Sequence, residues 1–285
     1  MCISPITLKS RTRLTYSSRP TKTVPCGKCV ECLNTRVNSW AFRLLEELKV
    51  SSSAVFLSLT YDDDHLPLAD VTNHYTNYET GEITEYHYKN VPVLNKKDYQ
   101  LFFKRLRKTT SNKLKYYACG EYGSSTHRPH YHAIIFNLPQ SSLKNPSIIE
   151  KAWGNGYVGF GDCNIATIKY TCKYIMKGLK RKNTTRPPEF ALMSKKMGLA
   201  HLTPQMLKYY KNHMTNAVTL PGGAKTPLPR YFRDKVFDKV ENHKIKIEYI
   251  TNQEEKFKSP HHEHEYKLNL IRIQNKINNL KRQKL

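Results

Sequence analysis

The alternation of side chains along Pro129–Phe136 predicts a strand at the centre of a sheet. Successive side chains of a strand point to opposite faces, so His130 and His132 share one face. That face continues with Ile134 and Phe136, and the opposite face is filled by Tyr131, Ala133 and Ile135. Apolar residues on both faces are typical of a strand that is covered above and below.

Other segments predict the elements around this strand. Short β-favouring runs predict strands at residues 54–60, 114–120 and 157–160. Apolar positions three and four residues apart predict helices at 34–50, 97–108, 147–153, from 164 onward and at 204–216. The predicted N-caps are Asn34 or Thr35, Asn95, Ser147 and Asn164. Residues 65–93 are polar and predict a loop with a short hairpin at 79–83. This order predicts an α+β fold with a central antiparallel sheet.

Charge points to the kind of partner. The chain has 285 residues, of which 47 are Lys or Arg and 23 are Asp or Glu, so its net charge is +24. The excess is spread along the chain, which favours a polyanionic partner bound through its phosphates. A membrane surface attracts the same charge, but no apolar stretch approaches about 20 residues and no signal peptide is visible. We therefore expect no membrane partner and a location in the cytoplasm of the host cell.

The two histidines of the central strand are a candidate metal site. Two neutral imidazoles on rigid backbone need one more ligand, and Glu121 is near enough in sequence to fold back beside His130. Two His and one carboxylate leave open positions for substrate and water, as a catalytic ion requires. The alternative is a pair of structural histidines.

A second candidate feature lies some forty residues downstream. At about 100° per residue, the side chains of Tyr170, Lys173, Tyr174 and Lys177 fall on one helix face. The apolar stripe opposite consists of Ile168, Cys172, Ile175 and Leu179. Two phenols beside two ammonium groups suit attack on a phosphodiester, because cations favour the nucleophilic phenolate. The alternative is an ordinary amphipathic helix with solvated Tyr and Lys.

Four of the seven cysteines lie near the N-terminus, at Cys2, Cys26, Cys29 and Cys32. In a reducing compartment this spacing favours metal ligation over a disulfide. Four thiolates suit a closed, tetrahedral Zn²⁺ site of structural purpose. An iron–sulfur ligand set and a group of free thiols are the alternatives.

Taken together, these motifs resemble those of the HUH endonucleases, the tyrosine nucleases that start rolling-circle DNA replication. The resemblance is strongest to the replication initiator proteins of microviruses, especially those of gokushovirus-like single-stranded DNA phages. Three motifs match in the family's order: residues 56–61, the metal motif 130–132 and the nucleophile motif from Tyr170 to Lys177. The tandem tyrosines are the most specific of these. The match extends to about residue 235.

The resemblance implies a fold, a reaction and partners. It implies an RRM-like HUH core in which Glu121, His130 and His132 hold Mg²⁺ or Mn²⁺. Tyr170 or Tyr174 would nick single-stranded origin DNA and form a 5′-phosphotyrosine, with Lys173 and Lys177 balancing charge. We further expect Arg128 and Lys169 to contact DNA, and a host polymerase and helicase to cooperate. The competing hypothesis is a non-catalytic, zinc-containing nucleic-acid-binding protein.

The predicted organisation has four segments. Residues 1–50 form the Cys-cluster segment and its helix, and residues 51–182 the HUH endonuclease core. Residues 183–235 form an accessory segment that looks family-like. Residues 236–285 are expected to be a basic helical tail, with an apolar stripe at Ile271, Ile277 and Leu280.

Overall fold

The computed structural model describes residues 2, 4–9, 21–174, 183–242 and 244–245. Two compact units divide the chain: Met1–Thr203 with Val218–Pro229, and Pro204–Ala217 with Arg230–Leu285. Three predicted features, namely Lys177, the apolar positions Ile175 and Leu179, and the stripe of the C-terminal tail, lie outside the described residues. The division into four segments stays a prediction.

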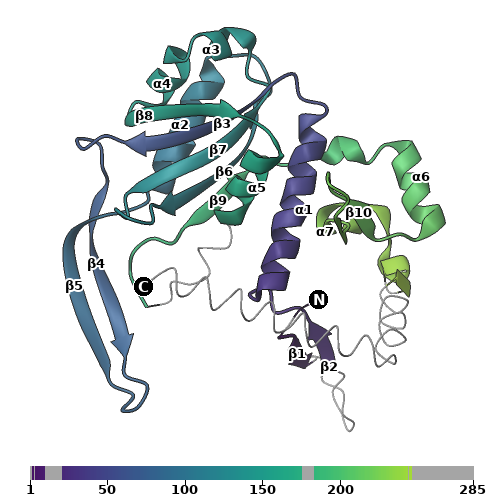
Figure 1. Ribbon diagram of the computed structural model, residues 1–285, viewed down its shortest axis with the longest axis horizontal. Coiled ribbons are helices and arrows are strands. Elements are labelled where there is room, and N and C mark those ends of the chain that lie inside the picture. Colours follow the sequence, from purple (N-terminus) through teal and green to yellow (C-terminus); the bar gives the residue numbers. More distant parts are fainter. Residues whose placement is uncertain (1, 3, 10–20, 175–182, 243, 246–285) are drawn as a thin grey trace. The chain divides into compact units, whose positions relative to one another are not determined.

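A five-stranded antiparallel sheet forms the centre of the first unit, so the predicted α+β fold is confirmed (Figure 1). Its strands, in spatial order, are β8 (Gly156–Asp162), β3 (Ala54–Tyr61), β7 (Pro129–Phe136), β6 (Lys115–Tyr122) and β9 (Phe190–Met193). The histidine strand β7 is the middle strand, as its pattern predicts. The sheet's last strand, β9, comes from the segment predicted to be accessory.

Helices cover the sheet on both sides, and each side has its own apolar core. The core that contains Tyr131, Ala133 and Ile135 is closed by α2 (Lys96–Lys108) and α4 (Ser147–Trp153). The core that contains Ile134 and Phe136 is closed by α1 (Val30–Leu48) and α5 (Ile165–Lys173). The two-sided burial predicted from the alternation of β7 is therefore confirmed.

The start of α1 differs from the prediction. The helix begins at Val30 with Cys29 as its N-cap residue, so neither Asn34 nor Thr35 caps it. The Thr35 hydroxyl instead donates to the carbonyl of Glu31 inside the helix. The cysteine run and the first helical turn are one structure, and Cys32 lies within that turn. The prediction was wrong because it treated the thiol cluster and the helix as separate segments.

The polar stretch after β3 also differs from the prediction. Instead of a loop with a short hairpin, it forms two long paired strands, β4 (Leu68–Thr76) and β5 (Ile83–Pro92). The turn between them is closed by the backbone N–H of Asn77, which donates to the carbonyl of Glu82. The first eight residues of β5 are exposed, so no apolar alternation marks this strand in the sequence.

The remaining elements are short. Asn95 and Asn164 cap α2 and α5 as predicted, but Ser147 is the first residue of α4 and makes no capping hydrogen bond. The predicted helix at 204–216 ends earlier, as α6 (Pro204–His213). The others are β1 (Ile6–Lys9), β2 (Thr21–Val24), α3 (Gln140–Lys144), η2 (Leu199–His201), β10 (Ala217–Thr219), β11 (Lys225–Pro227) and α7 (Arg230–Val236). None of the described helices combines the length and apolar character needed to cross a membrane.

Candidate active site

Glu121, His130 and His132 meet on one face of the sheet. Glu121 of β6 is the direct cross-strand partner of His130 of β7, so strand pairing brings the carboxylate to the histidines. Glu121 Oε1 lies 2.9 Å from Nε2 of His130 and 2.9 Å from Nε2 of His132. Glu121 and His132 are buried, and His130 is partly buried. The three side chains converge as a group that could hold a metal ion.

The hydrogen bonds of His130 test whether a cation suits this group. His130 Nδ1 lies 3.1 Å from the backbone carbonyl of Arg128, which can only accept a hydrogen bond. In the neutral imidazole Nδ1 therefore carries the proton, and the lone pair of Nε2 faces the carboxylate of Glu121. Two facing lone pairs require a cation between them, either a metal ion or a second proton. A histidine whose far nitrogen donates to a backbone carbonyl is also the usual arrangement of a metal ligand.

Both candidate nucleophiles pack against His132. The ring centroid of Tyr174 lies 5.2 Å from that of His132 in a stacked arrangement, and the ring of Tyr170 lies 5.2 Å away edge-on. The two phenol rings are 4.9 Å apart. This position follows from α5, whose apolar residues Ile168 and Cys172 are fully buried in the core against α1.

The environments of the two tyrosines differ. Tyr170 is 45% exposed, whereas Tyr174 is 8% exposed. Burial raises the pKa of Tyr174, and its contacts with Tyr170 and Glu121 add to this rise. A phenolate at Tyr174 therefore needs a nearby positive charge to form. The sequence alone carries no signal of this difference, because both tyrosines fall on the same predicted helix face.

Other predicted site residues are less close to the reacting groups. Lys173 is exposed and Lys169 is half-buried on the same helix. The guanidinium of Arg128 donates to the backbone carbonyl of Tyr61 and lies 2.8 Å from a carboxylate oxygen of Asp63. Arg128 therefore already ties the metal strand to the loop after β3, and a role in DNA binding stays a prediction.

Phe56 is a site residue that we did not predict individually. Its ring stacks on His132, with centroids 5.5 Å apart and planes inclined by 15°, and its edge meets Tyr170. The only signal in the sequence is its place in the first family-like motif. Pairing of β3 with β7 turns that motif into one wall of the site.

Comparisons with known proteins agree with this geometry. A family model of replication-associated proteins of the ORF2 type matches residues 54–179. The replication-associated protein VP4 of Bdellovibrio phage phiMH2K is 27% identical over 231 residues, which cover 74% of this chain and 66% of the relative. The replication-associated protein ORF2 of Spiroplasma virus 4 is 28% identical over 253 residues, covering 82% and 73%. The chain belongs to the phage replication-associated proteins.

A third relative, the replication-associated protein ORF4 of Chlamydia phage 1, is 26% identical over 237 residues. Those residues cover 74% of this chain and 53% of that relative, so the match spans little more than half of its length. No solved structure shows significant similarity to this replication-associated protein. The stretch matched by the family model contains Glu121, His130, His132 and both tyrosines, and it excludes the cysteine cluster.

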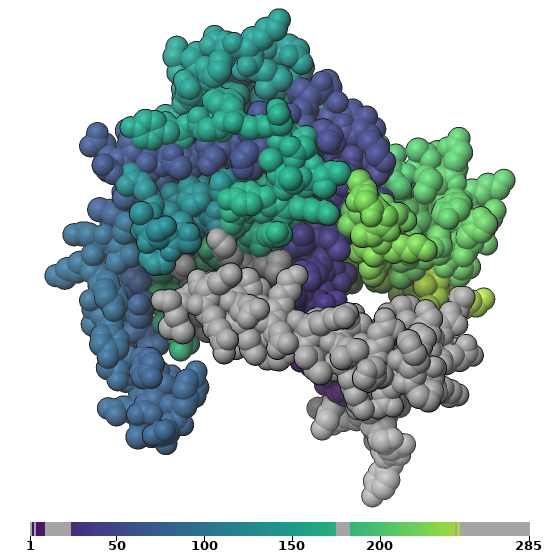
Figure 2. Space-filling model, viewed as in Figure 1, coloured from purple at the N-terminus to yellow at the C-terminus, as the bar shows by residue number. Residues whose placement is uncertain are grey.

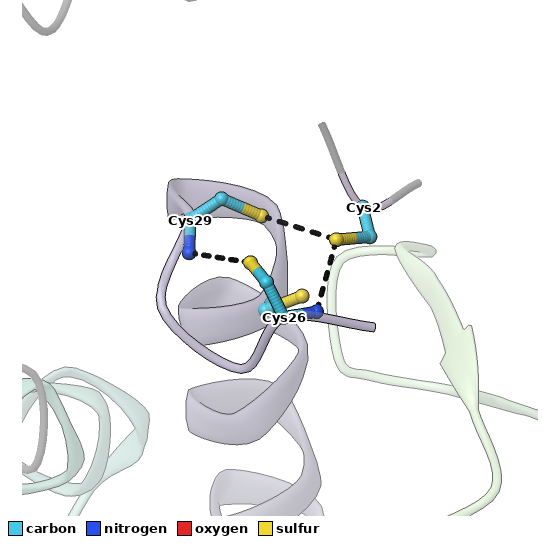
Figure 3. Close-up of side chains that lie close together, drawn as sticks. Cys2, Cys26 and Cys29 are labelled. Atoms are coloured by element: carbon cyan, nitrogen blue, oxygen red, sulfur yellow. Dashed lines mark hydrogen bonds between the residues drawn. The ribbon is translucent and has the colours of Figure 1, made fainter. Parts of the chain in front are cut away.

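The cysteine cluster of this replication-associated protein is assembled as predicted. Cys2, Cys26, Cys29 and Cys32 form a second group that could hold a metal ion, with their sulfur atoms all within 4.8 Å of one another. Cys29 Sγ lies 3.8 Å from Cys2 Sγ, and the backbone N–H of Cys26 donates to Cys2 Sγ (Figure 3). The cluster ties the N-terminal strand segment to the start of α1.

Backbone hydrogen bonds prepare one of these sulfurs for ligation. The N–H groups of Lys28 and Cys29 both donate to Cys26 Sγ and lower the pKa of its thiol. Burial raises the pKa of Cys32 to about 12, so that thiol deprotonates only when a cation balances it. A metal ion supplies that charge, because a coordinating thiol is deprotonated outright.

We expect about one zinc ion per chain in freshly purified, reduced protein, because four thiolates form a closed tetrahedral site. Elemental analysis should find that Cys26→Ser with Cys29→Ser removes this zinc. The matched control is Cys163→Ser, since Cys163 lies outside the cluster and should leave the zinc content unchanged. Reduced wild-type protein without zinc would contradict the assignment.

Proposed function

We propose that this protein is a metal-dependent endonuclease and strand transferase that initiates replication of a phage genome by nicking single-stranded origin DNA. One observation carries the proposal. Two phenols pack against His132, whose Nε2 lies 2.9 Å from the carboxylate oxygen that also contacts His130. Candidate nucleophiles and candidate metal ligands therefore share one small site, in a chain that belongs to the phage replication-associated proteins.

The proposed reaction is a transesterification. The phenol oxygen of Tyr170 or Tyr174 attacks the scissile phosphorus and loses its proton. The bond from phosphorus to the 3′ oxygen breaks, and that oxygen leaves as a free 3′-hydroxyl after taking up a proton. The 5′ end stays on the protein as a phosphotyrosine, which conserves the energy of the phosphodiester. Attack by another 3′-hydroxyl reverses the step and rejoins the ends.

Glu121, His130 and His132 would hold the ion, Mg²⁺ or Mn²⁺. When bound there, a divalent ion would polarise the scissile phosphate and neutralise its developing charge. Phe56 would keep the imidazole of His132 in place through ring stacking. Lys173 would add positive charge near the phenols, and Lys177, which lies outside the described residues, is proposed to act in the same way.

The accessibility of the tyrosines suggests an order of action. Tyr170 is the more exposed phenol and would meet the incoming strand first. Tyr174 would serve the second attack, after replication has gone round the circle and while Tyr170 still carries the 5′ end. A host polymerase would extend the 3′-hydroxyl with the help of a helicase in the host cytoplasm.

The direct test uses a labelled single-stranded oligonucleotide that contains the phage origin, with Mn²⁺ or Mg²⁺. We expect a covalent protein–DNA adduct that survives SDS and is absent when EDTA replaces the metal. The alternative function, a non-catalytic zinc-containing nucleic-acid-binding protein, is favoured by the cysteine cluster. Such a protein would shift the DNA on a native gel and leave no adduct on the denaturing gel.

A further inference from the structure

Tyr157 lies on β8, the edge strand of the central sheet, and faces the same side as the candidate active site. Thr60 of β3 pairs with His130 on one side and with Tyr157 on the other. Residues that pair across neighbouring strands project from the same face of a sheet. His130, Thr60 and Tyr157 therefore form one row across the sheet, and its far end is the phenol ring of Tyr157.

The neighbours of Tyr157 confirm which way it points. Val158, the next residue, packs against the core on the opposite face of the sheet. Adjacent side chains of a strand alternate, so Tyr157 projects on the face of the histidines. The strand is held close to β3 at Gly156, where a Cβ would collide with the backbone of Thr60 and Asp62. The base of Tyr157 is thus fixed on a rigid strand.

The ring of Tyr157 has no structural task within the described residues. It is 71% exposed, and neither its hydroxyl nor its ring makes a hydrogen bond or an aromatic contact with any described residue. Helix α5 packs over β7 and β6, so it leaves the β8 side of this face uncovered. The space-filling view shows atoms of β3 and β8 at the surface beside it (Figure 2). A large aromatic ring exposed on a rigid strand is available for a partner.

We propose that Tyr157 stacks on a base of the single-stranded DNA whose phosphate is bound at Glu121, His130 and His132. This inference rests on the proposed function, and it deepens that function by naming a base-contacting residue. Every nucleobase has a flat face, so stacking on an aromatic side chain holds a single strand without requiring a sequence. The phosphates of the same strand would be attracted by the +24 net charge.

The spacing suits one continuous strand. Neighbouring strands lie about 4.8 Å apart, so Tyr157 and His130 are separated by roughly 10 Å of sheet. That length corresponds to about three nucleotides at roughly 3.4 Å each. The acidic residues of the loop beside β8 are engaged with cationic or titratable groups, Asp62 with His65 and Asp63 with Arg128. A stacked base is uncharged and is not repelled by that loop.

The test compares binding of two probes in EDTA, so that no cleavage takes place. One probe is a 12-nucleotide oligothymidylate, and the other is an abasic strand of the same length and charge. We expect Tyr157→Ala to bind oligothymidylate about tenfold more weakly than the wild type does, with little change for the abasic strand. Tyr157→Phe keeps the ring and should bind as the wild type does. Tyr78→Ala is the matched control, because Tyr78 is 91% exposed in the hairpin turn away from the sheet.

Equal affinity of the wild type and Tyr157→Ala for oligothymidylate would overturn the stacking role. Equal loss of affinity for both probes would also overturn it, since the abasic strand offers no base to stack. Adduct formation by the wild type is measured separately with Mn²⁺ and decides the nuclease proposal. A wild type that forms the adduct and shows no effect of Tyr157→Ala would therefore refute only the role of Tyr157.

Discussion

Replacing both Tyr170 and Tyr174 with Phe is expected to abolish the covalent adduct with origin DNA, a loss of at least about 10³-fold in cleavage. The substitutions remove both candidate nucleophilic oxygens and keep the two rings that pack against His132. The fold and the DNA affinity should therefore be retained. Denaturing gels with a labelled oligonucleotide measure the adduct, and a native gel measures binding. The matched control is Tyr75→Phe with Tyr78→Phe in the exposed β4–β5 hairpin.

The single variants separate the roles of the two phenols. Tyr170→Phe and Tyr174→Phe should each still form an adduct, and the loss should be larger for Tyr170→Phe, because Tyr170 is the exposed phenol. Each should be poor at the strand transfer that releases a closed circle, since that step needs a second free tyrosine. Repeated circle release at the wild-type rate by either single variant would refute the alternation of nucleophiles.

His130→Ala or His132→Ala is expected to reduce cleavage by about 10³-fold or more while most of the salt-sensitive DNA binding remains. The chemistry depends on a divalent ion, which contributes several kcal/mol to stabilisation of the transition state. Binding depends on the many Lys and Arg residues of the chain, which these substitutions do not change. Cleavage of the labelled oligonucleotide and a salt titration of its affinity measure the two effects independently.

His65→Ala is the matched control for the metal ligands, because His65 is a surface histidine whose ring contacts Asp62. We expect it to cleave normally. Wild-type cleavage by the His130→Ala protein would contradict the proposed metal site. If Glu121→Ala cleaved normally, the third ligand would have to be sought elsewhere, and the loop at residues 62–65 would be the next candidate.

The parts of the site that the sequence predicts are those fixed by local geometry. A two-residue repeat puts His130 and His132 on one face, and a short loop returns the chain so that Glu121 pairs with His130. A four-residue spacing likewise puts Tyr170 and Tyr174 on one helix face. Apolar alternation on both sides of β7 was enough to predict the central strand of the sheet.

The parts that the sequence did not predict depend on distant contacts. The burial of Tyr174 arises because α5 packs over a sheet built from segments far away in the chain. The place of β9 in the sheet depends on pairing with β6, about seventy residues earlier, and four residues carry too little pattern to predict it. The β4–β5 hairpin is missed for another reason: most of its residues face solvent, and the hydrophobic alternation that marks a strand is absent.

The identity of the residue that carries the DNA tests the central claim most directly. Trypsin cleaves after Lys169 and Lys173, so Tyr170 and Tyr174 fall on different peptides. We expect mass spectrometry of the digested adduct to find a 5′-phosphorylated nucleotide on the peptide of Tyr170, on that of Tyr174, or on both. A nucleotide attached to any other residue, or a nicked strand with no protein attached, would contradict the account.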